Sequence, residues 1–187
     1  MRESWELQKK ITVGGTDYEI RSDFRAIIDI LIAQSDPELE DWEKLEVMFR
    51  IFYIDCNKIP EIHKEEALKK AIEFIDMGID SEERSPARIM DWEQDAPILI
   101  PSINQTLGYE IRNMDYLHWW TFMGGYMYMK EGIATTVISI RQKQAKGKKL
   151  DKWEKEFVSS NKKICKLQQK LTQKEKEEKE RLNKLLG

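Results

Sequence analysis

The sequence predicts a mainly α-helical protein, with an N-terminal β-hairpin packed on a helical bundle and a long basic C-terminal helix. Apolar residues recur every three to four positions in several segments, which is the spacing of one face of an α-helix. Charged residues make up 35% of the 187 residues, above the roughly 25% usual for soluble proteins, and this favours well-solvated helices. Hydrophobic residues, at 41%, are sufficient for a core, so we expect one domain or one domain with an appendage.

The predicted hairpin covers residues 8–21. Apolar and polar residues alternate on both sides of Gly14-Gly15, a pair that tolerates the positive φ angles of a tight turn. The alternating apolar residues are Ile11, Val13, Tyr18 and Ile20. A lone hairpin is only marginally stable, so we expect its apolar face to lie on the helices that follow.

Three amphipathic helices are predicted next, and their short connections indicate a small bundle. Ser22 is the expected cap of the first helix, which should end before Pro37. The second helix covers about 42–52, and the third runs from about 61 to 77, with Gly78 as its stop. The apolar stripes of the three helices are formed by Phe24, Ile27, Ile28, Leu31, Ile32, Trp42, Leu45, Met48, Phe49, Phe52, Leu68, Ala71, Ile72 and Ile75.

The middle of the chain combines a polar connector, predicted at 79–90, with two apolar segments. Pro101 removes a helical hydrogen bond from the first of these, so we expect a broken or bent element that Gly108 closes. Residues 114–129 are the densest apolar segment and favour a helix that is either buried or presents a face to a partner. Gly124-Gly125 would allow another backbone to approach this helix closely.

The last part of the chain is basic, whereas the rest is acidic. From Arg141 onward there are 16 Lys and Arg against 7 Asp and Glu, a net charge of +9, which leaves −12 for the preceding residues. The segment from Lys148 onward contains no proline and favours a long helix with an imperfect apolar seam. We therefore predict an acidic globular domain at 1–147 and a basic helical extension at 148–187. The pattern leaves open whether the extension docks on its own acidic body or projects towards a partner.

No catalytic, cofactor or metal site is predicted, and an enzyme is the least favoured class of function. His63 is expected in solvent and His118, between apolar neighbours, as a hydrogen-bonded packing residue. Neither lies in a zinc-site pattern, and no glycine loop has the Gly-Lys-Ser/Thr ending that binds phosphate. Asp91, Glu93 and Asp95 alternate as they would around a hard cation, but the acidic first turn of a helix explains them as well.

The remaining signals favour a soluble intracellular protein. We expect neither a membrane span, because no apolar run approaches about 18–20 residues, nor a signal peptide at the charged start. Cys56 and Cys165 are far apart in sequence and favour reduced thiols. Lysines beside Cys165 would lower the pKa of its thiol, although an unreactive bystander is the preferred interpretation.

A basic cluster precedes the extension and consists of Arg141, Lys143, Lys146, Lys148 and Lys149. Such a cluster could contact nucleic acid or an acidic protein surface. It contains few aromatic residues for base stacking, and the acidic body would repel phosphate. Nucleic-acid binding is therefore a secondary hypothesis.

Several motifs of the chain are distinctive. They are Gly15-Thr16-Asp17-Tyr18-Glu19-Ile20, Asp91-Trp92-Glu93-Gln94-Asp95-Ala96-Pro97, Leu107-Gly108-Tyr109-Glu110, Tyr116-Leu117-His118-Trp119-Trp120-Thr121-Phe122 and Lys146-Gly147-Lys148-Lys149-Leu150-Asp151-Lys152-Trp153-Glu154. With these motifs the sequence resembles the bacteriophage gene product fifteen family, small proteins of siphophage and prophage tail modules. The resemblance covers nearly the whole chain.

The resemblance implies a non-catalytic role in tail morphogenesis, similar to that of tail assembly chaperones. Such a chaperone binds the tape-measure protein, helps to recruit tail-tube subunits, and acts in the host cytoplasm. The alternative is a minor structural protein retained in the virion tail. Trp119, Trp120, Met123, Met127 and Met129 would supply an adaptable apolar surface for a helical partner, or they are simply core residues. The oligomeric state stays open.

Overall fold

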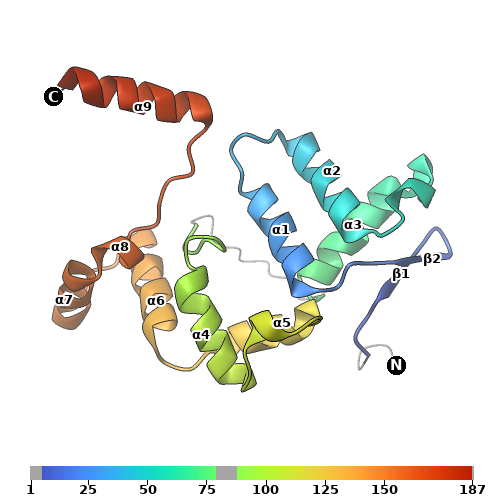
Figure 1. Ribbon diagram of the computed structural model, residues 1–187, viewed down its shortest axis with the longest axis horizontal. Helices are drawn as coiled ribbons and strands as arrows, with labels where there is room; N and C mark the ends of the chain where they lie inside the picture. Colours follow the sequence, from blue (N-terminus) through green and yellow to red (C-terminus); the bar gives the residue numbers. More distant parts are fainter. Residues whose placement is uncertain (1–5, 79–87, 187) are drawn as a thin grey trace.

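A computed structural model describes residues 6–78 and 88–186, and this part of the chain is mainly helical, with one two-stranded sheet (Figure 1). The mainly α fold with an N-terminal hairpin is therefore confirmed. In chain order the strands and α-helices are β1 (Lys10–Val13), β2 (Thr16–Glu19), α1 (Phe24–Gln34), α2 (Asp41–Phe52), α3 (Lys64–Ile75), α4 (Ala96–Leu107), α5 (Trp119–Met127), α6 (Ile133–Ala145), α7 (Lys152–Ser160), α8 (Lys162–Cys165) and α9 (Gln173–Leu186). Most of the connector predicted at 79–90 lies outside the described residues.

The hairpin forms as the alternation predicts and is attached to α3. β1 and β2 pair antiparallel around Gly14 and Gly15, which have φ angles of 55° and 79°. Ile11 and Val13 are buried, and the backbone N–H of Gly14 donates to the Glu66 carboxylate on α3. These contacts place the apolar face of the hairpin on the helices.

The first three helices bury an aromatic centre that includes Phe52 and Tyr53. The side chain of Asp23, not of Ser22, caps α1 by accepting the N–H of Arg25 at 3.0 Å. The prediction was one residue early because Ser22 is buried and shares a hydrogen bond with the Tyr116 hydroxyl. The stripe of α2 is buried only in its second half, since Trp42, near its start, is 69% exposed.

The element around Pro101 is not broken: α4 is assigned as one helix through this proline and ends at Gly108 in the left-handed conformation, with φ of 83°. Pro101 removes the hydrogen bond to the carbonyl of Pro97, four residues earlier. Both prolines are exposed, so the released carbonyl lies on the side where water can bind it. Of the two alternatives, a broken or a bent element, the break is therefore excluded, whereas the predicted closure at Gly108 is confirmed.

The helix predicted within residues 114–129 is shorter than the apolar segment, because α5 begins only at Trp119. Its close approach is to α4: a Cβ built on Gly125 would lie 2.8 Å from Cγ of Leu107 and 3.0 Å from Cγ2 of Ile103. Gly125 therefore allows α4 and α5 to pack closely. Gly124 has no atom within 4 Å of such a Cβ.

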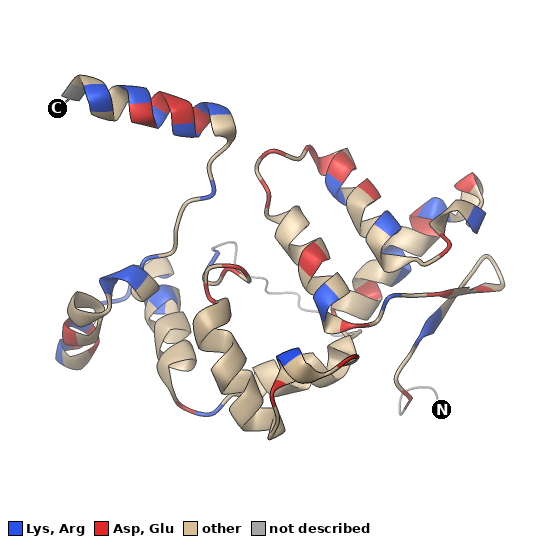
Figure 2. Cartoon of the chain, in the orientation of Figure 1, with Lys and Arg blue, Asp and Glu red and all other residues tan. Residues whose placement is uncertain are grey.

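The single long helix predicted from Lys148 is wrong, since this region forms α7, α8 and α9 (Figure 1). Between α8 and α9 the chain is not helical over residues 166–172, which we call the linking segment. Its main chain forms hydrogen bonds to side chains of the body, and these replace the bonds of a continuous helix. Beyond it, α9 lies apart from the other helices and carries closely spaced charges of both signs (Figure 2).

Candidate interaction surfaces

The tryptophan pair Trp119-Trp120 closes the end of α3. The indole N–H of Trp119 donates to the carbonyl of Ile75 at 2.8 Å, and that of Trp120 donates to the carbonyl of Phe74 at 2.9 Å. The last carbonyls of a helix lack partners within it, so the Trp119 bond satisfies the Ile75 carbonyl, whereas the Phe74 carbonyl also accepts the N–H of Met77 at 3.0 Å. Trp119 is 1% exposed and therefore belongs to the core.

His118 joins three parts of the chain. Its Nδ1 accepts the N–H of Trp120 at 3.1 Å, which caps α5, and its Nε2–H donates to the carbonyl of Gln8 at 2.9 Å. Its backbone also bridges to Asp23 at the start of α1. Burial lowers the pKa of the imidazole, in agreement with a neutral ring that donates at one nitrogen and accepts at the other.

An exposed apolar patch follows α5, and we call residues 127–133 the α5–α6 turn. Tyr128 is 78% exposed, Ile133 55% and Met127 54%, whereas Met129 is half-buried. Met123, one turn earlier in α5, is also half-buried and packs against the core. Of the five residues predicted as a partner-binding surface, Met127 is thus the most exposed, and the two tryptophans are structural.

The basic cluster is smaller than the sequence indicates. Arg141 is buried, and Lys143 forms an ion pair of 2.5 Å with Glu154 on α7. Lys146, Lys148 and Lys149 are exposed. Three lysines therefore remain from the five cationic residues as a surface that a partner could contact.

Arg141 is the centre of a buried polar cluster. Its Nη1 and Nη2 donate to the two carboxylate oxygens of Asp95 at 2.6 and 2.9 Å, and both side chains are under 5% exposed. The remaining N–H groups donate to the carbonyls of Ile89, Ile164 and Cys165. All five guanidinium donors are used, so Arg141 fixes α8 to the turn before α4.

The carboxylates that alternate at 91–95 find cationic partners within the protein. Asp91 accepts from Arg88 and lies 3.4 Å from the Lys170 ammonium. Burial acts to raise the pKa of Asp91, but the Gln94 backbone N–H and the Arg88 guanidinium outweigh it and hold this pKa below its usual range. Among the described residues no three His, Cys, Asp or Glu side chains are arranged to hold a metal ion.

Cys165 is almost fully buried, and the lysines near it in sequence do not govern its thiol. Its exposed fraction is 3%, and burial raises the pKa of the thiol, with a smaller opposing effect from Arg141. This result favours the interpretation of Cys165 as an unreactive thiol.

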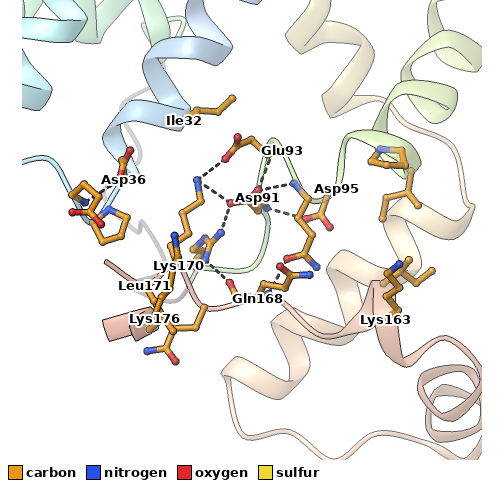
Figure 3. A pocket seen from close by; sticks show the side chains of 18 residues that line it. Ile32, Asp36, Asp91, Glu93, Asp95, Lys163, Gln168, Lys170, Leu171 and Lys176 are labelled. Carbon is orange, nitrogen blue, oxygen red and sulfur yellow. Dashed lines mark hydrogen bonds and ion pairs between the residues drawn. The ribbon is translucent and has the colours of Figure 1, made fainter. Parts of the chain in front are cut away.

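A groove of about 890 Å³ lies between the end of α1, residues 91–98 and the linking segment (Figure 3). Its walls carry carboxylates from Asp36, Glu38, Asp91 and Glu93. Lys170 points into it and towards Asp91 and Glu93. The sequence gives no local signal for this groove, because its walls come from segments far apart in the chain.

The distinctive motifs therefore have structural roles: Trp119 and Trp120 close α3, Asp95 holds Arg141, and Gly108 ends α4. The model of the bacteriophage Gp15 protein family matches residues 6–167. The chain belongs to the bacteriophage Gp15 protein family. The match includes every helix of this Gp15-family protein up to α8 and ends within the linking segment.

Membership of the Gp15 family implies a role in the structure or morphogenesis of a phage particle. No curated protein and no solved structure matches the chain. In residues 6–78 and 88–186 of this Gp15-family protein, no helix has both the length and the apolar character needed to cross a bilayer.

Proposed function

We propose that this protein is a non-catalytic tail assembly chaperone that binds the tape-measure protein of its phage and supports assembly of the tail tube. The observation that carries the proposal is membership of the Gp15 family, whose model matches residues 6–167. The resemblance to this family implies a role in the tail module. Action in the host cytoplasm during assembly is part of the same proposal.

The α5–α6 turn is the surface that best suits a long amphipathic helical partner. It combines a flexible thioether at Met127 with two exposed apolar side chains, Tyr128 and Ile133. Methionine adapts to irregular apolar surfaces, and apolar side chains on a helix dock into such patches. The patch follows a helix that is fixed at its start by His118 and Trp119, so it is presented on a rigid support.

The test is co-expression with the tape-measure protein of the same phage, followed by co-purification. We expect a soluble complex, and we expect Tyr128→Glu and Ile133→Glu each to reduce the recovered partner by about tenfold or more, since a buried unpaired charge opposes docking. Ile62→Glu is the matched control, because Ile62 is 84% exposed on the turn before α3 and should leave recovery unchanged.

Two outcomes would contradict the proposal. One is failure to recover a well-expressed tape-measure protein with the unmodified chain. The other is abundant peptides of this chain in the mass spectrum of purified virions, which would assign it instead to the structural proteins that remain in the tail.

A further inference from the structure

The linking segment is held mainly through its backbone. Gln94 uses both ends of its amide: Nε2 donates to the carbonyl of Lys166 at 2.8 Å, and Oε1 accepts the N–H of Gln168 at 2.8 Å. Arg88 donates to the carbonyl of Gln168 at 2.9 Å. Backbone groups are the same in every residue, so these three bonds do not require the side chains of this particular segment.

One side chain of the segment is recognised specifically, and it is Lys170. Its ammonium lies 2.8 Å from the Ser35 hydroxyl, 3.0 Å from Glu93 and 3.4 Å from Asp91. The Lys170 side chain is 22% exposed, so the contact is largely shielded from water. The three acceptors form a binding site for a lysine ammonium. The lysine that occupies it lies four residues after Lys166, the residue whose carbonyl Gln94 binds.

We call the groups that hold the linking segment the receptor, and the linking segment itself the occupant. The two belong to different parts of the chain. Ser35, Arg88, Glu93 and Gln94 all lie within the residues matched by the family model, whereas Lys170 lies beyond its end at residue 167. The groove also has more room than the segment uses, since about 890 Å³ remains accessible around it. The binding groups therefore lie within the family match, whereas the occupant only begins within it, at residues 166 and 167, and its lysine side chain at position 170 lies beyond it.

We propose that this groove is a binding site for an extended, lysine-bearing segment of a partner protein, and that residues 166–172 are its resident and displaceable occupant. Displacement would free the linking segment together with α9, which contacts little of the body. The proposal does not depend on the chaperone function, because it concerns a different surface from the α5–α6 turn.

The test uses the full chain and a fluorescent peptide that copies residues 166–173, with binding followed by anisotropy. In the unmodified protein the tethered segment competes with the peptide at a high effective concentration. Lys170→Ala weakens this competitor and leaves the receptor intact. We expect the K170A chain to bind the peptide at least about tenfold more tightly than the unmodified chain.

Three controls make the result specific. Lys174→Ala changes an exposed lysine of α9 and should leave peptide affinity as in the unmodified chain. Gln94→Ala added to K170A should weaken peptide binding by about tenfold or more, because the two backbone bonds are lost. The second lysine of the peptide corresponds to Lys170. A peptide with alanine at this position should bind the K170A chain about as weakly as the unchanged peptide binds the chain that carries both K170A and Gln94→Ala. Lys170→Met, which retains the aliphatic stem, replaces K170A if that variant does not fold.

Equal peptide affinity of the unmodified and K170A chains would overturn the proposal, as would the absence of binding to both. Binding that Gln94→Ala leaves unchanged would also overturn it, because the peptide would then occupy another surface.

Discussion

The indole N–H of Trp119 donates to the carbonyl oxygen of Ile75 across 2.8 Å, and this contact joins two helices that are 44 residues apart in the chain. The carbonyl belongs to the last residue of α3, where the helix offers no partner of its own. The tryptophan thus serves both as a large core side chain and as a helix cap. Its two roles can be separated by substitution.

Trp119→Phe retains an aromatic ring but removes the donor. We expect the free energy of unfolding to fall by about 1–3 kcal/mol, because the Ile75 carbonyl is left without its partner. Trp153→Phe is the control: Trp153 is 58% exposed and should change stability by less than about 0.5 kcal/mol. Urea unfolding measures both, and equal effects of the two variants would contradict the capping role.

The adjacent glycines of α5 provide a matched pair. Gly125→Ala places a methyl group 2.8 Å from Leu107 and should destabilise the protein by about 1–3 kcal/mol. Gly124→Ala meets no neighbouring atom and should be neutral or stabilise the helix by up to about 1 kcal/mol. Thermal unfolding of the two variants distinguishes them, and the opposite order would show that α4 and α5 are not packed this closely.

The buried pair of Arg141 and Asp95 should behave as a unit. Asp95→Ala or Arg141→Ala alone leaves a buried charge without its partner and should cost about 3–5 kcal/mol. The double variant should cost less than the sum of the two, which a double-mutant cycle measures. Arg50 and Glu46 form an exposed ion pair of 2.6 Å and serve as the control, for which we expect little coupling. Additive effects at positions 95 and 141 would contradict the pairing.

His118 should make stability depend on pH. Burial lowers the pKa of its imidazole in the folded protein, whereas the unfolded chain has a pKa of about 6.5. The unfolded state therefore binds the proton first as pH falls. The stability that comes from this neutral histidine is fully present above about pH 6.5 and is lost as pH decreases towards the folded-state pKa.

Urea unfolding at about pH 7.5, 6.5 and 5.5 measures this dependence. The unmodified protein should lose stability over this range, and His118→Gln, which cannot take up the proton, should lose less. Parallel curves for the two proteins would exclude His118 as the source. The slope, not the absolute stability, is the quantity to compare, because the substitution also removes a hydrogen bond to Gln8 or Trp120.

Local patterns in the sequence predicted much of the fold. Alternation around Gly14-Gly15 identified the hairpin, and the spacing of apolar residues located the first three helices. Gly108 was identified correctly as a helix end because its conformation depends on residues beside it. These features are determined within a few residues of the chain, and a sequence pattern can report them.

Features that depend on distant partners could not be predicted in this way. Asp95 and Arg141 are 46 residues apart, so Arg141 was assigned to a surface cluster. The composition of the C-terminal region favours a helix throughout, but hydrogen bonds from Gln94 and Arg88 hold residues 166–168 out of one. For the candidate surfaces, the sequence did not divide the apolar segment into its core tryptophans and its exposed turn, because that division depends on the distant bonds of Trp119 and Trp120 to α3.

The closure of α3 by Trp119 and Trp120 also has a consequence for synthesis of the protein. The ribosome synthesises the N-terminal helices before the groups that complete their ends. These groups are the indole N–H donors of Trp119 and Trp120 for α3, and the backbone N–H of Leu117, which binds Asp23 at the start of α1. Domains fold as units once their contacts are available. The N-terminal helices therefore cannot reach their final state until residues 117–120 have been made and have left the ribosome.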